Sequence, residues 1–70
     1  MHVITVNDDA SVRALCEFLR KVHVQVVEVR GLEVCACVPG APSDLHERRE
    51  LVGYVVTWNA LNPGREAILL

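Results

Sequence analysis

The spacing of apolar and polar positions changes several times along the chain, and each spacing predicts one element. Residues 2–6 (HVITV) form a short β-branched run that predicts a strand. The next segment, residues 9–22, repeats its apolar side chains at helical intervals, and these are Val12, Leu15, Leu19 and Val22. Asn7 or Asp8 can accept hydrogen bonds from the free amides of its first turn. The sequence therefore opens with a strand and a one-sided amphipathic helix.

Residues 23–38 (HVQVVEVRGLEVCACV) predict a β-hairpin. Arg30 and Gly31 supply a tight turn, which places Val29 opposite Leu32. Because side chains alternate along a strand, one face of the hairpin is expected to carry Val27, Val29, Leu32, Val34, Ala36 and Val38. The other face is expected to carry Val24, Val26, Glu28, Glu33, Cys35 and Cys37.

The second half of the chain predicts a loop, a long helix and a last strand. Residues 39–44 (PGAPSD) exclude regular structure, and Ser43 or Asp44 can cap a helix with Glu47 reaching back in a capping box. The β-branched residues of 51–58 would also suit a strand. Helical spacing continues to residue 61, however, and the stop signal comes at residues 62–64 (NPG), so we expect a helix over 43–61. Residues 65–70 then predict a strand.

The resulting order, βαββαβ, predicts an α+β fold with one domain spanning residues 1–70. The simplest arrangement is a ferredoxin-like two-layer sandwich, with a four-stranded antiparallel sheet and both helices on one face. The first and third strands are expected in the middle. This plan resembles that of small-molecule regulatory (ACT-type) domains and of heavy-metal-associated domains. Residues 7–12 (NDDASV) replace the Cys-x-x-Cys of the latter, so copper chemistry is not implied.

The sheet face without helices is predicted to be apolar and to form an interface. We expect it to carry one of two sets from the last strand, either Ala67 and Leu69 or Glu66, Ile68 and Leu70. The candidate interface residues are Val3, Thr5, Val24, Val26, Cys35, Cys37 and Leu69. A contiguous apolar patch on a small domain usually marks an interaction site. We therefore expect a homodimer, or else a protein partner or a small ligand, on this face.

Composition narrows the function classes. Hydrophobic residues make up 51% of the 70 residues, which is a large share for a chain that can bury only about 60% of its surface. The net charge of −2, with no basic stripe, argues against nucleic-acid binding. No secretory leader or membrane-length apolar run is apparent, and three cysteines do not make a disulfide framework. A cytoplasmic protein that does not bind membranes is expected.

Cys35 and Cys37 are the residues whose chemistry needs explaining. They point the same way, about 6.6 Å apart at ~3.3 Å per residue, which is too far for a disulfide between them. Packing as small apolar side chains is the favoured interpretation, and Cys16 is expected to be a buried structural thiol. We expect no catalytic residue, metal or cofactor, and a non-enzymatic module. The alternatives are a small dimeric enzyme with a pocket between helices and sheet, or a soft-metal protein using the Cys-x-Cys strand.

Overall fold

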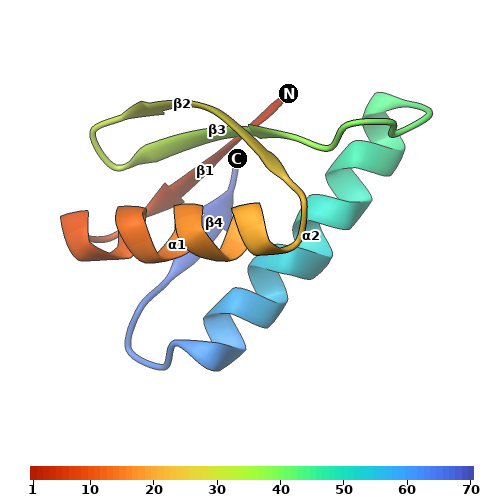
Figure 1. Cartoon of the computed structure of the whole chain (residues 1–70). Helices are drawn as coiled ribbons and strands as arrows, with labels where there is room; N and C mark the ends of the chain where they lie inside the picture. Colours follow the sequence, from red (N-terminus) through yellow and green to blue (C-terminus); the bar gives the residue numbers. More distant parts are fainter.

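The computed structural model describes all 70 residues as two helices and one four-stranded antiparallel sheet (Figure 1). The elements in chain order are β1 (His2–Val6), α1 (Asp9–Lys21), β2 (Gln25–Arg30), β3 (Glu33–Cys37), α2 (Asp44–Leu61) and β4 (Ala67–Leu69). The strands lie in the order β2-β3-β1-β4. The predicted α+β class and ferredoxin-like element order are therefore confirmed, with β1 and β3 in the middle of the sheet.

Both helices begin at side-chain caps. The Asp8 carboxylate accepts a hydrogen bond from the Ser11 amide at 2.7 Å, and the Ser43 hydroxyl accepts one from the His46 amide at 3.2 Å. Such caps satisfy amides that have no partner inside the helix. The predicted capping box is wrong, because the two carboxylate oxygens of Glu47 contact the Val38 amide and the Met1 amino group instead. Residues 51–58 are helical, as the spacing predicted.

Twelve buried side chains form one hydrophobic core. Six come from the sheet side, three from α1 and three from α2: Ile4, Val6, Val24, Val34, Ala36 and Ala67; Leu15, Cys16 and Leu19; Leu51, Val55 and Trp58. Trp58 is 1% exposed and is the largest of them. Because side chains alternate along a strand, the six core residues from the sheet side mark one face of the sheet, which we call the core face.

The β2–β3 hairpin differs from its predicted register in two ways: its turn lies one residue later than predicted, and β2 contains a β-bulge. Val26 lies opposite Ala36, but Glu28 lies opposite Cys35, so Val27 is an extra residue on β2. A bulge of this kind shifts the alternation of the strand by one. The turn consists of Gly31 and Leu32, and Gly31 has a φ of +56° that suits a residue without a side chain.

The bulge corrects the predicted faces of Val24 and Val26, at the start of the hairpin. Val24 is 3% exposed, and Val26 packs against the core, so both belong to the core face and not to the candidate interface. Val27, Val29 and Leu32 were predicted to be core residues, but their exposed fractions are 49%, 45% and 38%. Val27 is the bulge residue and Leu32 lies in the turn, whereas Val29 lies opposite Val34, on the predicted face, and is exposed near the turn end of the hairpin. The alternation of side chains in the sequence cannot reveal the extra residue, because positions 26 and 27 are both valine.

The last strand also corrects one prediction. Leu69 lies opposite Ile4, and Ala67 lies opposite Val6, so both belong to the core face. Ile68 lies opposite Thr5 and therefore points to the other side. Leu69 is thus not part of the apolar face for which it was proposed.

Candidate functional site

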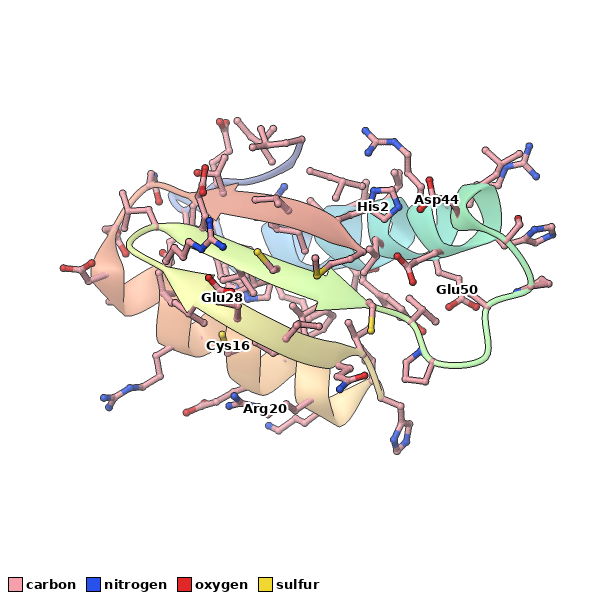
Figure 2. All side chains as sticks on the ribbon, turned by 90° about the horizontal axis from the view of Figure 1, so that it is seen from above. His2, Cys16, Arg20, Glu28, Asp44 and Glu50 are labelled. Carbon is pink, nitrogen blue, oxygen red and sulfur yellow. The ribbon has the colours of Figure 1, made fainter.

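The side of the sheet opposite the core face carries a group of small and apolar side chains. We call it the outer sheet face and define it by Val3, Thr5, Cys35, Cys37, Ile68 and Leu70. Val3 lies opposite Cys35 and Thr5 lies opposite Ile68, and side chains of paired residues share a face. The Leu70 amide donates to the Val3 carbonyl at 2.9 Å and extends the β1–β4 pairing. Figure 2, seen from above, looks onto this face.

Exposure is greatest along the β4 side of the outer sheet face. Ile68 is 48% exposed and Leu70 is 58% exposed, while the residues from β1 and β3 are half-buried. The structure thus brings four predicted interface residues together: Val3, Thr5, Cys35 and Cys37. Ile68 and Leu70 take the place of the three that were wrongly assigned. The sequence offered both sets for the last strand, and no residue in 65–70 indicates which one faces the core.

Charged and polar groups surround this apolar area. Glu28 and Arg30 form an ion pair near the hairpin turn, and this contact lowers the pKa of Glu28 and raises that of Arg30. Glu33 lies opposite Arg30. At the far end of the hairpin, Gln25 lies opposite Cys37. The outer sheet face is therefore apolar in its middle and polar at its margins.

The three thiols occupy two different environments. Cys16 is buried in the core, and burial raises the pKa of its thiol, so it has the inert surroundings expected of a structural cysteine. Cys35 and Cys37 are half-buried and free. The Cys37 thiol donates a hydrogen bond to the Gln25 side-chain oxygen at 3.3 Å. None of these contacts provides the base that a nucleophilic cysteine requires.

A second cluster brings together residues that the sequence did not connect. His2 at the start of β1 lies beside Asp44 and Glu47 in the first turn of α2, and Figure 2 shows His2 next to Asp44. The His2 Nε2 atom is 3.0 Å from Asp44 Oδ1 and 3.7 Å from Glu47 Oε1. More than 40 residues separate His2 from the other two, and no motif links them. Sequence reasoning could not have found this cluster.

Glu47 is fixed by contacts on both oxygens. Its Oε2 accepts a hydrogen bond from the Val38 amide at 3.0 Å, and its Oε1 lies 2.6 Å from the Met1 amino group. These partners lower the pKa of Glu47, and the Met1 amino group is the larger cause. The side chain is almost fully buried, so the carboxylate is held as an anion between β1, β3 and α2.

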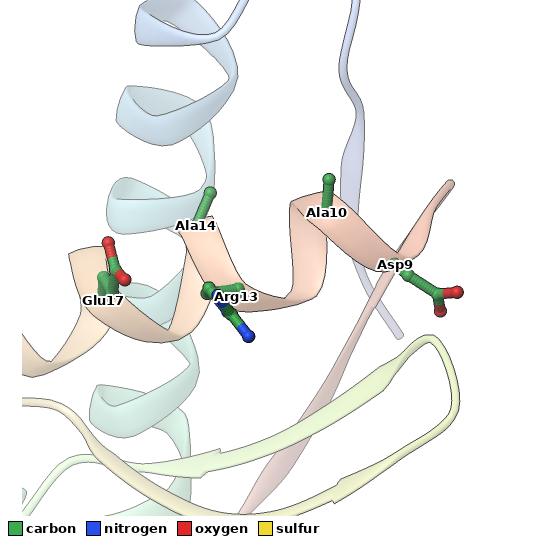
Figure 3. A pocket seen from close by; sticks show the side chains of 5 residues that line it. All are labelled: Asp9, Ala10, Arg13, Ala14 and Glu17. Carbon is green, nitrogen blue, oxygen red and sulfur yellow. The ribbon is translucent and has the colours of Figure 1, made fainter.

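The surface has one pocket, and it does not lie where an enzyme was envisaged. Its volume is about 400 Å³, and five residues of α1 line it: Asp9, Ala10, Arg13, Ala14 and Glu17 (Figure 3). The enzyme alternative requires a pocket between the helices and the sheet. Because its lining comes from α1 alone, this pocket gives that alternative no support.

Comparison of the chain with protein-family models, curated proteins and solved structures found no match. Neither helix has the length and apolar character that crossing a membrane requires.

Proposed function

We propose that the protein is a non-enzymatic association module in which two copies pack together through their outer sheet faces. We infer that both helices cover the core face as a two-layer ferredoxin-like sandwich, since both contribute to one core cluster with it. The outer sheet face is then the side without a helix. An antiparallel sheet of this kind normally presents polar side chains to water. The apolar middle of this face is the observation on which the proposal rests.

The available area suits a small, reversible dimer. Strands of five residues at ~3.3 Å per residue, four of them ~4.8 Å apart, span a plane of roughly 300 Å². A standard interface buries about 800 Å² on each partner. The isolated chain exposes 4301 Å², so an interface of that size would take up about a fifth of its surface. The plane alone is smaller than a standard interface, so the dimer must also use the margins of the face, and we expect it to be weak and reversible.

The sheet edges favour packing of faces over addition of strands. β2 forms one edge and carries the bulge at Val27, while β4 forms the other edge and is only three residues long. Bulges and short edge strands both discourage pairing with a second chain. A second copy is thus directed toward the face of the sheet.

Charge and side-chain size agree with self-association. The Glu28–Arg30 pair neutralises itself, so two identical faces would not oppose large like charges. The central side chains are small, which suits sheets that stack about 10 Å apart. An apolar centre with a polar margin is the usual anatomy of an interface. We place this dimer in the reducing cytoplasm, because all three cysteines are free thiols.

The experiment is sedimentation velocity over a range of concentrations, with light scattering to fix the mass. The wild-type chain should reach the dimer mass at high micromolar concentration. Ile68→Glu, which places a charge on the outer sheet face, should stay monomeric. Val56→Glu is the matched control, because Val56 is an equally apolar residue of α2 with 63% exposure. A wild-type chain that remains monomeric, or a control that dissociates equally, contradicts the proposal.

A further inference from the structure

We propose that His2, Asp44 and Glu47 form a binding site for a divalent transition-metal ion, with Zn²⁺ as the best match to its ligands. This site lies at the start of β1 and of α2 and is independent of the outer sheet face. The three ligand atoms all come within 4.8 Å of one another. One imidazole and two carboxylates form the donor set.

The spacing of the ligand atoms agrees with coordination by one ion. Zinc binds histidine nitrogen and carboxylate oxygen at about 2.0–2.2 Å, so two of its tetrahedral ligands lie roughly 3.4 Å apart. The distances from His2 Nε2 to Asp44 Oδ1 and to Glu47 Oε1 are 3.0 Å and 3.7 Å, on either side of that value. Three protein ligands leave a fourth position for water.

One of the ligand atoms, His2 Nε2, is buried without a hydrogen bond. His2 Nε2 has almost no solvent contact and makes no hydrogen bond, although two carboxylates lie near it. Glu47 is 9% exposed, and the partner of its Oε1 is the Met1 amino group at 2.6 Å. Buried polar atoms normally have a partner, and one without a partner needs an explanation. A cation bound beside His2 Nε2 would supply that partner.

The surroundings hold two of the ligands in place and leave the third able to adjust. The Val38 amide fixes Glu47 through Oε2, so that Oε1, which pairs with the Met1 amino group, is the atom that would face the ion. This is the kind of supporting contact that orients metal-binding carboxylates. The Asp44 side chain is 78% exposed and free to turn. Backbone pairing of β1 with Ala36 on β3 fixes the position of His2.

Two positive groups stand near the cluster. Arg48 Nη1 is 3.5 Å from His2 Nδ1, and it donates to the Leu70 carbonyl at 2.7 Å, so its charge lies on the other side of the imidazole ring. The Met1 amino group is paired with Glu47 and would compete with a metal ion for it. The two carboxylates still give the ligand set a charge that a divalent ion balances. Imidazole among the ligands selects Zn²⁺ over Mg²⁺, which prefers oxygen alone.

The test is titration of the purified chain with Zn²⁺ in a calorimeter, with Mg²⁺ as the comparison ion. Cys35→Ser and Cys37→Ser are introduced first, because free thiols that are only half-buried also bind zinc. We expect one Zn²⁺ per chain, and an affinity at least about tenfold weaker in His2→Gln and in Asp44→Asn. The matched controls are His23→Gln and Asp9→Asn, since Asp9 begins α1 as Asp44 begins α2. Both controls should bind like their parent.

A second readout guards against a folding defect. Circular dichroism should show each variant folded, and Co²⁺ bound to the chain should lack the charge-transfer absorption that thiolate ligands produce. The proposal is overturned if no stoichiometric Zn²⁺ binds, or if the His2 and Asp44 variants bind as tightly as the controls. Zinc that binds only when Cys35 and Cys37 are present would also overturn it. None of these results bears on self-association, which sedimentation measures separately.

Discussion

The side chain of Asn59 pairs with the backbone of Ala67 much as a neighbouring strand would. Its amide nitrogen donates to the Ala67 carbonyl at 3.0 Å, and its oxygen accepts from the Ala67 amide at 2.8 Å. Ala67 begins β4, a strand of three residues at the edge of the sheet. The two hydrogen bonds join α2 to that edge strand.

Replacement of Asn59 should therefore loosen the C-terminal strand. Asn59→Ala removes both hydrogen bonds and leaves the Ala67 backbone groups partly buried without partners, so we expect a loss of about 1–3 kcal/mol in the free energy of unfolding. Urea denaturation measures this loss, and hydrogen exchange should show faster exchange at β4. Thr57→Ala, at an exposed position of the same helix, should change stability by less than ~0.5 kcal/mol. Equal effects of the two substitutions would contradict the role given to Asn59.

The β-bulge makes opposite predictions for two valines of the same hairpin. Val24→Ala should destabilise the fold by about 1.5–3 kcal/mol, because Val24 is 3% exposed and its removal leaves a cavity. Val27→Ala should lie within ~0.5 kcal/mol of the wild type, since its side chain is 49% exposed. Thermal or urea unfolding of the two variants side by side gives the answer. A larger loss of stability in Val27→Ala than in Val24→Ala would contradict a bulge at Val27.

Acid should weaken the fold through Glu47. The Met1 amino group and the Val38 amide lower its pKa below the ordinary value of 4.5. A carboxylate with a lowered pKa in the folded state stabilises that state above its unfolded pKa, and this contribution disappears as the pH falls through the folded value. Glu47→Gln should therefore be less stable than the wild type at pH 7, and the difference should shrink below about pH 4.

Urea unfolding at several pH values measures that convergence. Glu50→Gln is the matched control, because Glu50 is an exposed residue of the same helix. Its stability should follow the wild type across the whole range. If the Glu47 variant and the wild type keep a constant difference down to the acid transition, the ion pair is not the source of the acid sensitivity.

Self-association should change the chemical reactivity of the thiols. In dilute solution, iodoacetamide should modify Cys35 and Cys37 faster than Cys16, which is buried and has a raised pKa. At concentrations where the dimer forms, the outer sheet face is covered, and modification of the first two should slow. Mass spectrometry of digested protein measures each site. In Ile68→Glu the rates should not depend on concentration, and a wild-type chain that behaves in the same way would argue against the dimer.

The sequence predicted the elements well because local signals define them. Caps at Asp8 and Ser43 and a stop after Leu61 mark the helices, and helical spacing outweighed the strand propensity of residues 51–58. The faces of the edge strands were less predictable. Val26 and Val27 are chemically identical, so nothing marks the bulge between them and Glu28. In β4, alternation among Ala67, Ile68 and Leu69 allows either orientation.

The residues of the candidate sites were likewise predictable where a local pattern places them, and not where a tertiary contact does. Val3, Thr5, Cys35 and Cys37 were placed on one face because they lie on the two central strands, where the alternation is regular. The cluster of His2 with Asp44 and Glu47 depends on how α2 sits against the start of β1. That is a tertiary contact with no sequence signature, and Glu47 in particular resembled a capping residue.

The pairing of Leu70 with Val3 has a practical consequence for work on this protein. The two ends of the chain emerge on adjacent strands, and Figure 1 shows them close together. A purification tag or reporter fused to either end would begin beside the outer sheet face and beside His2. Cleavable tags are therefore advisable, since a bulky fusion there would obstruct both surfaces at once.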